Sequence, residues 1–505
     1  MAELVKETYS SMALCPTQLV QASIKGDVIV PDIKPDAAKV LQTSAYYMPE
    51  DAVLENSKVK LQGSLSFTVL YLSQEESPKL CSVTAALPVA EEVNLDGIVK
   101  EEDRVKFQVD YHPENIRCTL LNGRKFSLSA LLEMEVKVTR YEDTAIIMDV
   151  QSEDTLVVSR VERNLRKLIG DKEEKLVVRE IAEIPAGSPN VEEVLWWEVD
   201  IRDRSHQILE DRVQVKGELA VSILYQTESG VQFIEHSEPF SGLIDVGGTT
   251  DGMECRLRMD TLKGEVRMDQ DADGEMRLLP IEVVVGCRVQ VWQEEKRALL
   301  ADAYDTQREV VLEKPLCPML TPIYNGPIRV EIGETLDMPE GMPMALQVFY
   351  FTAHPKIDDC TIDDDHMRVE GVLYVTAFCL TADDRSPVIS FTDTVPFEKD
   401  IEISGAKPGQ NAEVSAHMER VKAELKGDQS LQMKAVLQLD VSISQEEMQP
   451  VLTELSFEER EEAELPQMAV YYLQPGETAW DVGKRYRIRP ENMEKLNDSV
   501  LIVVR

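Results

Sequence analysis

The chain has 505 residues, of which 43% are hydrophobic and 29% are charged, so it is too apolar to be disordered and long enough for about three domains. Its 92 acidic residues against 53 lysines and arginines give a net charge of −39, which disfavours nucleic acid and anionic membranes as partners and favours a basic protein surface. The chain opens without a signal sequence, lacks the roughly 18-residue apolar stretch of a membrane helix, and scatters its 8 cysteines without a CxxC pair. These features predict a cytoplasmic protein with reduced thiols.

One block of sequence recurs three times at a constant spacing. Gly63, Gly217 and Gly371 lie 154 residues apart, twice over. Paired prolines upstream keep the same offset, at Pro31 and Pro35, Pro185 and Pro189, and Pro339 and Pro343. An offset kept at so many positions without a gap predicts three copies of one domain.

The elements of each copy follow from local patterns. The paired prolines predict a turn, followed by either a short helix (36–42 in the first copy) or an extended start. Around each repeated glycine every second residue is apolar, which predicts a half-buried strand whose glycine marks a bulge, a bend or a close approach of another backbone. Asn122 and Gly123 predict a hairpin turn, and each copy ends in another alternating run.

This pattern predicts a mainly β protein with three tandem antiparallel domains, and it leaves sandwich and barrel open. The expected boundaries are 1–150, 151–305 and 306–447 for the three repeats, 448–467 for an acidic linker and 468–505 for a small C-terminal domain. Residues 448–467 are predicted to form a solvated linker or a single exposed helix, and the alternative is an acidic docking segment.

Residues with metal-binding or catalytic chemistry form no convincing site. Asp358, Asp359, Cys360, Asp363, Asp364, Asp365 and His366 make the densest cluster of potential ligands, but a solvated loop is favoured because the other two copies have few ligands there. The run from Asp269 to Gly274 matches the start of a calcium loop, but Pro280 stands where the bidentate glutamate belongs, so a hairpin turn is expected. The histidines lie outside known catalytic motifs, and we therefore predict no enzyme activity, no metal and no cofactor.

Trp196 and Trp197 are adjacent in the second copy, and two readings of the pair remain open. Partial burial within the domain is favoured over an aromatic platform for a partner.

The last segment predicts strand, helix, helix and strand in under 40 residues. The first strand leads into a turn at Gln474–Gly476 and a helix whose apolar side chains include Trp480 and Tyr486, both assigned to the small core. Pro490 is expected to open a second helix carrying Met493 and Leu496, and 500–504 forms the closing strand.

The run QPGETAWDVGKRY resembles a LysM domain. Such domains commonly bind N-acetylglucosamine polymers between two loops. Here the second loop is shortened, because Asn497 and Asp498 lead almost directly into the last strand, so protein contact is favoured over glycan. The resemblance implies partner-binding residues by position, namely Gln474, Pro475, Gly476, Glu477 and Thr478, with Asn497 and Asp498 opposite.

The runs DVIVPDIKPDAAKVL and KLQGSLSFTVLYLS resemble SPOCS domains of endospore-forming bacteria, and three such domains before a LysM resemble clostridial spore coat morphogenesis proteins. The resemblance implies a non-enzymatic scaffold in the mother cell, at the forespore surface. It would bind the coat-morphogenetic ATPase, stage IV sporulation protein A, through the LysM domain. The alternative is a lectin that binds peptidoglycan in the wall or cortex. Self-association through strand edges remains open.

Overall fold

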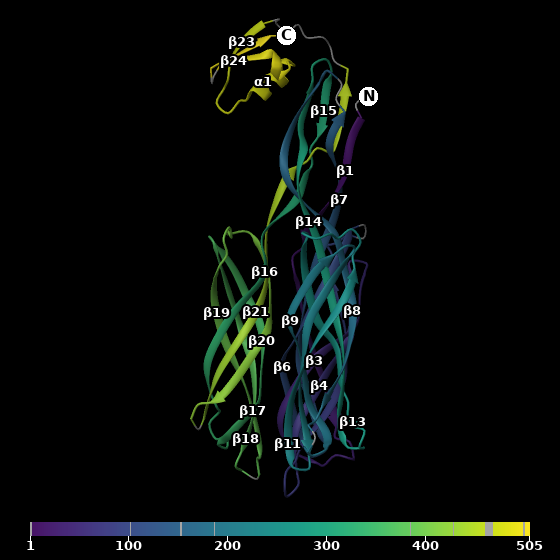
Figure 1. Cartoon of the computed structure of the whole chain (residues 1–505), viewed down its shortest axis with the longest axis vertical. Coiled ribbons are helices and arrows are strands. Elements are labelled where there is room, and N and C mark those ends of the chain that lie inside the picture. Colours follow the sequence, from purple (N-terminus) through teal and green to yellow (C-terminus); the bar gives the residue numbers. More distant parts are fainter. Residues whose placement is uncertain are drawn as a thin grey trace.

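Long antiparallel strands make up almost the whole chain, as the alternating sequence predicts. The computed structural model describes residues 3–100, 103–151, 154–185, 187–383, 385–427, 429–459, 468–497 and 500–504. Three β units lie with their strands along the long axis of the molecule, and a narrower bundle of strands rises from one end of them (Figure 1). A small C-terminal unit stands beside that bundle.

The first unit has six strands, with these bounds: β2 (Gln18–Ile29), β3 (Ala37–Glu55), β4 (Lys58–Ser73), β5 (Leu80–Asn94), β6 (Arg104–Asn122) and β7 (Lys125–Gln151). One sheet has the order β3–β4–β5, and the other places β7 between β2 and β6. The two sheets face each other across an apolar core, and among the described residues no strand of one sheet pairs with a strand of the other, so the unit is a sandwich. This decides between the two architectures that the sequence left open.

The second and third units repeat this plan. The second unit comprises β8 (Leu156–Glu183), β9 (Val191–Leu209), β10 (Arg212–Thr227), β11 (Gly230–Asp245), β12 (Glu254–Val266), β13 (Asp269–Gln270) and β14 (Met276–Asp305). The third comprises β16 (Leu316–Asp337), β17 (Ala345–Asp363), β18 (His366–Thr381), β19 (Val388–Glu402), β20 (Asn411–Leu425) and β21 (Ser430–Pro450). In each unit the strand that carries the repeated glycine is the middle strand of its sheet.

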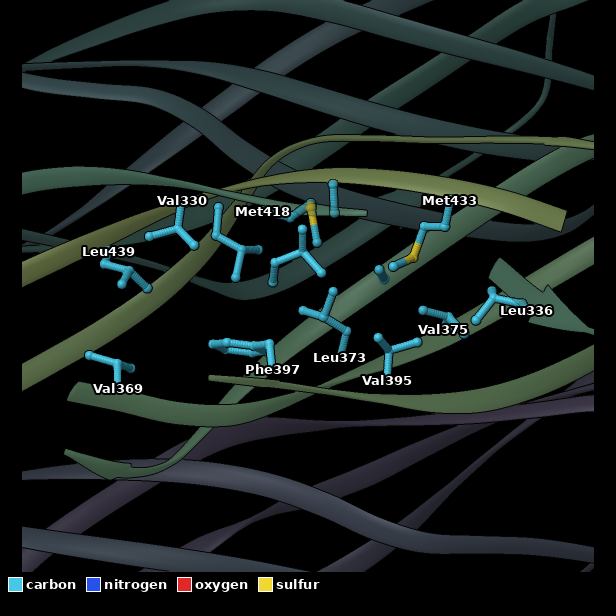
Figure 2. Close-up of a cluster of buried hydrophobic side chains, with 14 of the residues drawn as sticks. Val330, Leu336, Val369, Leu373, Val375, Val395, Phe397, Met418, Met433 and Leu439 are labelled. Carbon is cyan, nitrogen blue, oxygen red and sulfur yellow. The ribbon is translucent and has the colours of Figure 1, made fainter. Parts of the chain in front are cut away.

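Each sandwich buries the apolar residues of alternate strand positions. In the third unit Leu373 and Val375 of β18 point toward Met433 and Leu439 of β21, and all four are at most 1% exposed (Figure 2). Burying one such side chain contributes about 1.5–3 kcal/mol, so the period-two pattern is sufficient to specify which face of each strand is inside.

The segment after the paired prolines is extended. Ala37 begins β3 and pairs with Ser73 of β4, and its side chain is buried in the core of the first unit. Of the two structures left open for residues 36–42, the extended start is therefore the one that forms, and the short helix does not.

The repeated glycines allow close approach of neighbouring groups, as predicted. Each one faces an irregularity in the preceding strand, where the pairing register shifts. A Cβ at Gly371 would collide with the carbonyl oxygen of Lys356 and with the ring of Phe397. The glycine therefore gives room for a β-bulge in β17.

We expect Gly371→Ala to destabilise the protein by about 1–3 kcal/mol, because the backbone of β17 has to move to admit the methyl group. Gly333→Ala in β16 is the matched control, since its Cβ would meet only the Met433 carbonyl oxygen at 3.8 Å. That change should be neutral or slightly stabilising. Chemical unfolding of both variants checks the difference, and equal midpoints would contradict the packing argument.

The ends of the longest strands continue beyond the sandwiches into a shared bundle, which we call the stalk. It has three arms: β1 (Glu3–Leu14) with residues 139–151, residues 156–170 with 292–305, and residues 316–322 with 445–450. Next to them β15 (Glu309–Glu313) pairs with β22 (Glu454–Glu458). Buried residues of all three arms meet in one cluster, formed by Tyr9, Ile146, Met148, Leu299, Cys317, Met319 and Val451. The three units therefore share a core at this end.

The stalk includes part of the segment expected to be a linker. Val451 and Leu452 are buried, and residues 454–458 form β22. The described part of 448–467 is thus neither a free linker nor a helix, because its apolar residues complete the stalk. Residues 460–467 lie outside the described residues.

The three units meet a second time far from the stalk. Leu70, Leu224 and Phe378 lie at the repeat spacing of 154 residues, and all three are buried in one cluster. Because these side chains point out of their own sandwiches and into the space between units, the cluster ties the three sheets together around a common axis.

The C-terminal unit differs from the predicted strand–helix–helix–strand order. It contains β23 (Met468–Tyr472), α1 (Ala479–Tyr486), a single 3-10 turn at Pro490–Asn492, β24 (Met493–Asn497) and β25 (Val500–Val504). The expected second helix is wrong: Met493 and Leu496 lie in a strand that pairs with β25. Only two residues separate β24 from β25, and so short a connection favours a hairpin.

Candidate functional site

The loop predicted to bind a partner joins β23 to α1. Gly476 has a φ of +85°, a conformation that favours glycine, and it makes the turn. Gln474 and Pro475 are exposed. No hydrogen bond or ion pair among the described residues joins the side chain of either to the rest of the molecule, so both are available to a partner.

Glu477 and Thr478 have structural roles within the same loop. The Glu477 carboxylate accepts hydrogen bonds from the Gln474 backbone N–H and the Tyr471 hydroxyl, each at 3.1 Å, and pairs with Arg485 at 2.7 Å. The backbone donor is the main cause that lowers the pKa of Glu477. Thr478 caps α1 in a reciprocal capping box with Asp481. These two side chains therefore hold the loop in shape.

The second predicted loop is described only in part. Asn497 ends β24, at the edge of the hairpin with β25. Asp498 lies outside the described residues. The partner role of both residues stays a prediction.

Trp480 does not belong to the small core, contrary to the prediction. That core consists of Val482 and Ile488, with Tyr486 and Met493 packed against it. Trp480 instead contacts Tyr304 of the stalk, with ring centroids 4.9 Å apart, and its indole N–H donates to Asp302 at 2.9 Å. Helical spacing places an aromatic residue on one face of α1, but the sequence does not reveal that this face meets another unit.

Asp302 collects three donors at this contact. Trp480, Lys484 and Lys314 all donate to its carboxylate at 2.8–2.9 Å. Burial alone would raise the pKa of Asp302, but the hydrogen bonds from Lys484 and Trp480 outweigh it and lower the pKa to about 2.

The two adjacent tryptophans lie at contacts between units and not in the core of their own unit alone. Trp196 is 5% exposed and packs edge-on against Phe378 of the third unit, at 5.9 Å between ring centroids. Trp197 packs against Tyr46 of the first unit at 6.0 Å. Burial within the domain therefore holds only for Trp197, which also packs on the core of its own unit, whereas Trp196 is buried between units.

The two acidic runs singled out in the sequence lie at hairpins, but the first is not the predicted loop, because Asp358 to Asp363 belong to β17 and His366 begins β18. Asp364 and Asp365 make a tight hairpin between β17 and β18, and Asp271–Gly274 makes the hairpin between β13 and β14. Within the described residues, no group of three or more His, Cys, Asp or Glu side chains is arranged to hold a metal ion.

A cavity of about 1720 Å³ lies between the three units, and side chains of all three line it. Ion pairs cross it from unit to unit: Arg258 with Asp110 at 2.5 Å, Lys356 with Glu114, and Arg256 with Glu413. His354 faces Glu198 at 2.6 Å, and the charge of that carboxylate raises the pKa of His354 to about 9. The sequence repeat does not reveal these pairs, because each pair joins residues at non-equivalent positions of two repeats.

In the part of the chain that the structure describes, no helix has the length and apolar character needed to cross a bilayer.

Comparison with known proteins identifies the repeat. A family model described as SipL, SPOCS domain, matches the chain three times, over residues 36–121, 190–268 and 345–426. Each match covers four strands of one sandwich, from β3 to β6, from β9 to β12 and from β17 to β20. Neither the curated proteins nor the solved structures contain a match to the chain. The resemblance of the three repeats to SPOCS domains is confirmed, and the chain is a SipL/SPOCS-domain protein, of a kind linked to sporulation.

Proposed function

We propose that this protein is a non-enzymatic scaffold of spore coat morphogenesis. It acts in the mother-cell cytoplasm at the forespore surface, where it binds the coat-morphogenetic ATPase, stage IV sporulation protein A, and helps that ATPase encase the forespore. The C-terminal unit, which we regard as a LysM domain, makes the contact.

The observation that carries the proposal is the threefold match to the SPOCS domain of SipL. The arrangement of the chain supports it further. Three sandwiches joined at both ends form an elongated body, and the C-terminal unit stands at one end of that body (Figure 1). Such an arrangement suits a scaffold that presents a small recognition unit at a fixed distance from a larger surface.

The exposed loop of the C-terminal unit supports a protein partner over a glycan. Gln474 and Pro475 are exposed, and the hairpin from β24 to β25 replaces the longer second loop of a glycan-binding groove. A net charge of −39 favours a partner with a basic face, and raising the salt should weaken binding because surface charges are screened within about 10 Å at 0.1 M.

We expect the full chain to bind the immobilised ATPase saturably and peptidoglycan not at all. Gln474→Arg should weaken ATPase binding at least tenfold, because a bulky charge in a desolvated contact costs more than about 1.4 kcal/mol. Titration by surface plasmon resonance measures both effects.

Glu491→Gln is the matched control, since Glu491 is exposed on the same unit outside the predicted loop. It should bind like the unaltered protein, and both variants should keep its melting temperature. Binding to peptidoglycan alone would overturn the proposal and favour the lectin function. Full ATPase affinity of Gln474→Arg would exclude this loop as the contact.

A further inference from the structure

The face of α1 that carries Trp480 lies on the second arm of the stalk. Tyr304 packs edge-on against the indole and donates a hydrogen bond through its hydroxyl to the Ile488 carbonyl oxygen at 2.7 Å. Lys484 contacts both carboxylate oxygens of Asp302 at 2.8 Å. At the end of the helix, Arg487 donates to the Arg308 carbonyl oxygen and to Glu309. We call Asp302 and Tyr304 the seat.

The approach of helix and stalk is close enough to require a glycine. A Cβ at Gly483 would lie 2.7 Å from the Tyr304 hydroxyl oxygen, nearer than such atoms come. Gly483 is in the middle of α1, where glycine costs about 1 kcal/mol relative to alanine. A Cβ there would also lie 2.9 Å from the Met493 side chain and 3.1 Å from the Ile488 carbonyl oxygen, so the sequence carries an unfavourable helix residue where the stalk and the unit's own core both approach α1.

The seat exists on one arm only. The buried pairs Ile146–Ile147, Leu299–Leu300 and Val451–Leu452 align the three arms, and the position two residues further on is acidic in each: Asp149, Asp302 and Glu454. Two residues after this acid, the first arm has Gln151, the second has Tyr304 and the third has Ser456. The acid is repeated, but the aromatic residue is specific to the second arm, which gives the C-terminal unit a single place to dock.

The seat lies next to the predicted partner loop. Thr478, the last residue of the loop, is two residues from Trp480. Asp481 is close enough to Asp302 for the two negative charges to repel each other. A specific protein interface buries about 800 Å² on each partner and involves about 20–30 residues of it. A footprint of that size cannot be confined to five loop residues, and the face of α1 that the stalk covers is the surface next to the loop over which it can extend.

The side chains on that face of α1 are also typical of a protein-binding surface. Trp480 and Arg487 are of the residue types that dominate binding energy at protein interfaces, and Lys484 adds a positive charge between them. Its occupant here, an acid beside a tyrosine, shows that this one face of the C-terminal unit, unlike the chain as a whole with its net charge of −39, fits an acidic patch next to an aromatic side chain. We propose that the stalk occupies the partner-binding face of the C-terminal unit in cis, and that a protein partner has to displace the seat in order to bind. The proposal rests on the proposed function, because it concerns the regulation of that same contact.

The contact is suited to displacement. It consists of one aromatic pair and a few polar contacts, and the Lys484 side chain remains 45% exposed. Docking within one chain nevertheless benefits from a high effective concentration, on the order of millimolar for short connections. The C-terminal unit can therefore stay docked on the seat in the free protein even if its intrinsic affinity for the seat is modest. A partner can still displace it.

The test compares the full-length protein with Asp302→Ala and with Tyr304→Ala. In both variants amide hydrogen exchange in α1 should accelerate while the sandwiches stay protected, because the helix loses its partner surface. The affinity for the ATPase should rise at least threefold, since binding no longer has to displace the stalk. Asp149→Ala on the first arm is the control; this exposed acid is paired with Arg160 and should change neither readout.

The outcomes separate the two proposals. Unchanged exchange in α1 of both variants would mean that the seat does not hold the unit, and the inference fails. Faster exchange with unchanged or weaker ATPase binding would also overturn it, because the seat would then not compete with the partner. No ATPase binding by any form of the protein would defeat the proposed function, and with it the competition.

Discussion

Phe378→Ala should destabilise the protein by about 3–5 kcal/mol without unfolding the sandwich that contains this residue. Phe378 is fully buried, but it points out of its own unit. Its ring packs against Trp196 of the second unit at 5.9 Å and against Tyr350 of its own unit at 5.7 Å. Removing the ring leaves a cavity between units, and large-to-small changes of buried aromatics have costs of this size.

Tyr374→Ala is the matched control for that change. Tyr374 lies four residues earlier on the same face of β18 and is 43% exposed, at the wall of the cavity between the units. Its loss should change stability by about 0.5 kcal/mol at most. Thermal unfolding followed by calorimetry measures both variants, and hydrogen exchange locates the loss. Equal effects, or loss of protection inside the third sandwich, would contradict the assignment of Phe378 to the contact between units.

The sequence predicts the individual units well because their information is local and repeated. Alternation around Gly63, Gly217 and Gly371 defines a buried face, and turn residues such as Asn122 define the hairpins. The antiparallel strands of each unit follow from these patterns. The choice between sandwich and barrel does not, because it depends on which edge strands pair, and edge pairing leaves no periodic signal.

The packing of the three units against one another could not be predicted from the sequence, for a related reason. Strands such as β7 and β14 keep the same alternation where they leave the sandwich and enter the stalk, so the pattern does not mark the transition. The inward and outward faces of a strand both contain apolar residues when the outer face meets another unit. Leu70 and Leu224 therefore look like ordinary surface or core leucines until the three copies are placed together.

The candidate site shows the same division. The turn at Gly476 and the cap at Thr478 follow directly from the sequence, because both are local backbone requirements. The location of Trp480 does not, since helical spacing gives a face of α1 and not its neighbour. Likewise, the second helix was expected at Pro490 because proline favours a first helical turn, but pairing with β25 overrode that preference.

The contact between the first and second units is expected to weaken at low pH. Asp171 joins the first and second units below the stalk: its carboxylate accepts hydrogen bonds from Arg288 at 2.8 and 3.0 Å and from the Tyr141 hydroxyl at 2.8 Å, and its side chain is 3% exposed. Burial alone would raise its pKa, but the bonds from Arg288 and Tyr141 and the charges of Arg288 and Lys106 outweigh burial and lower the pKa to about 2.

Asp171→Asn should therefore destabilise the protein by about 3–5 kcal/mol at pH 7, because the buried Arg288 loses its close, buried carboxylate partner and keeps only the exposed Glu173 at 3.5 Å. Since the pKa of Asp171 in the folded protein lies below the unfolded value of about 3.9, its contribution is fully present above that pH and is lost as the pH falls through about 2. The stability difference between the unaltered protein and the variant should accordingly shrink between about pH 5 and pH 2. Asp143→Asn, which removes an exposed pair with Arg104, should cost at most about 1 kcal/mol. Denaturant unfolding at several pH values measures both, and a difference for Asp171→Asn that stays constant with pH would show that its charge does not stabilise the contact between the units.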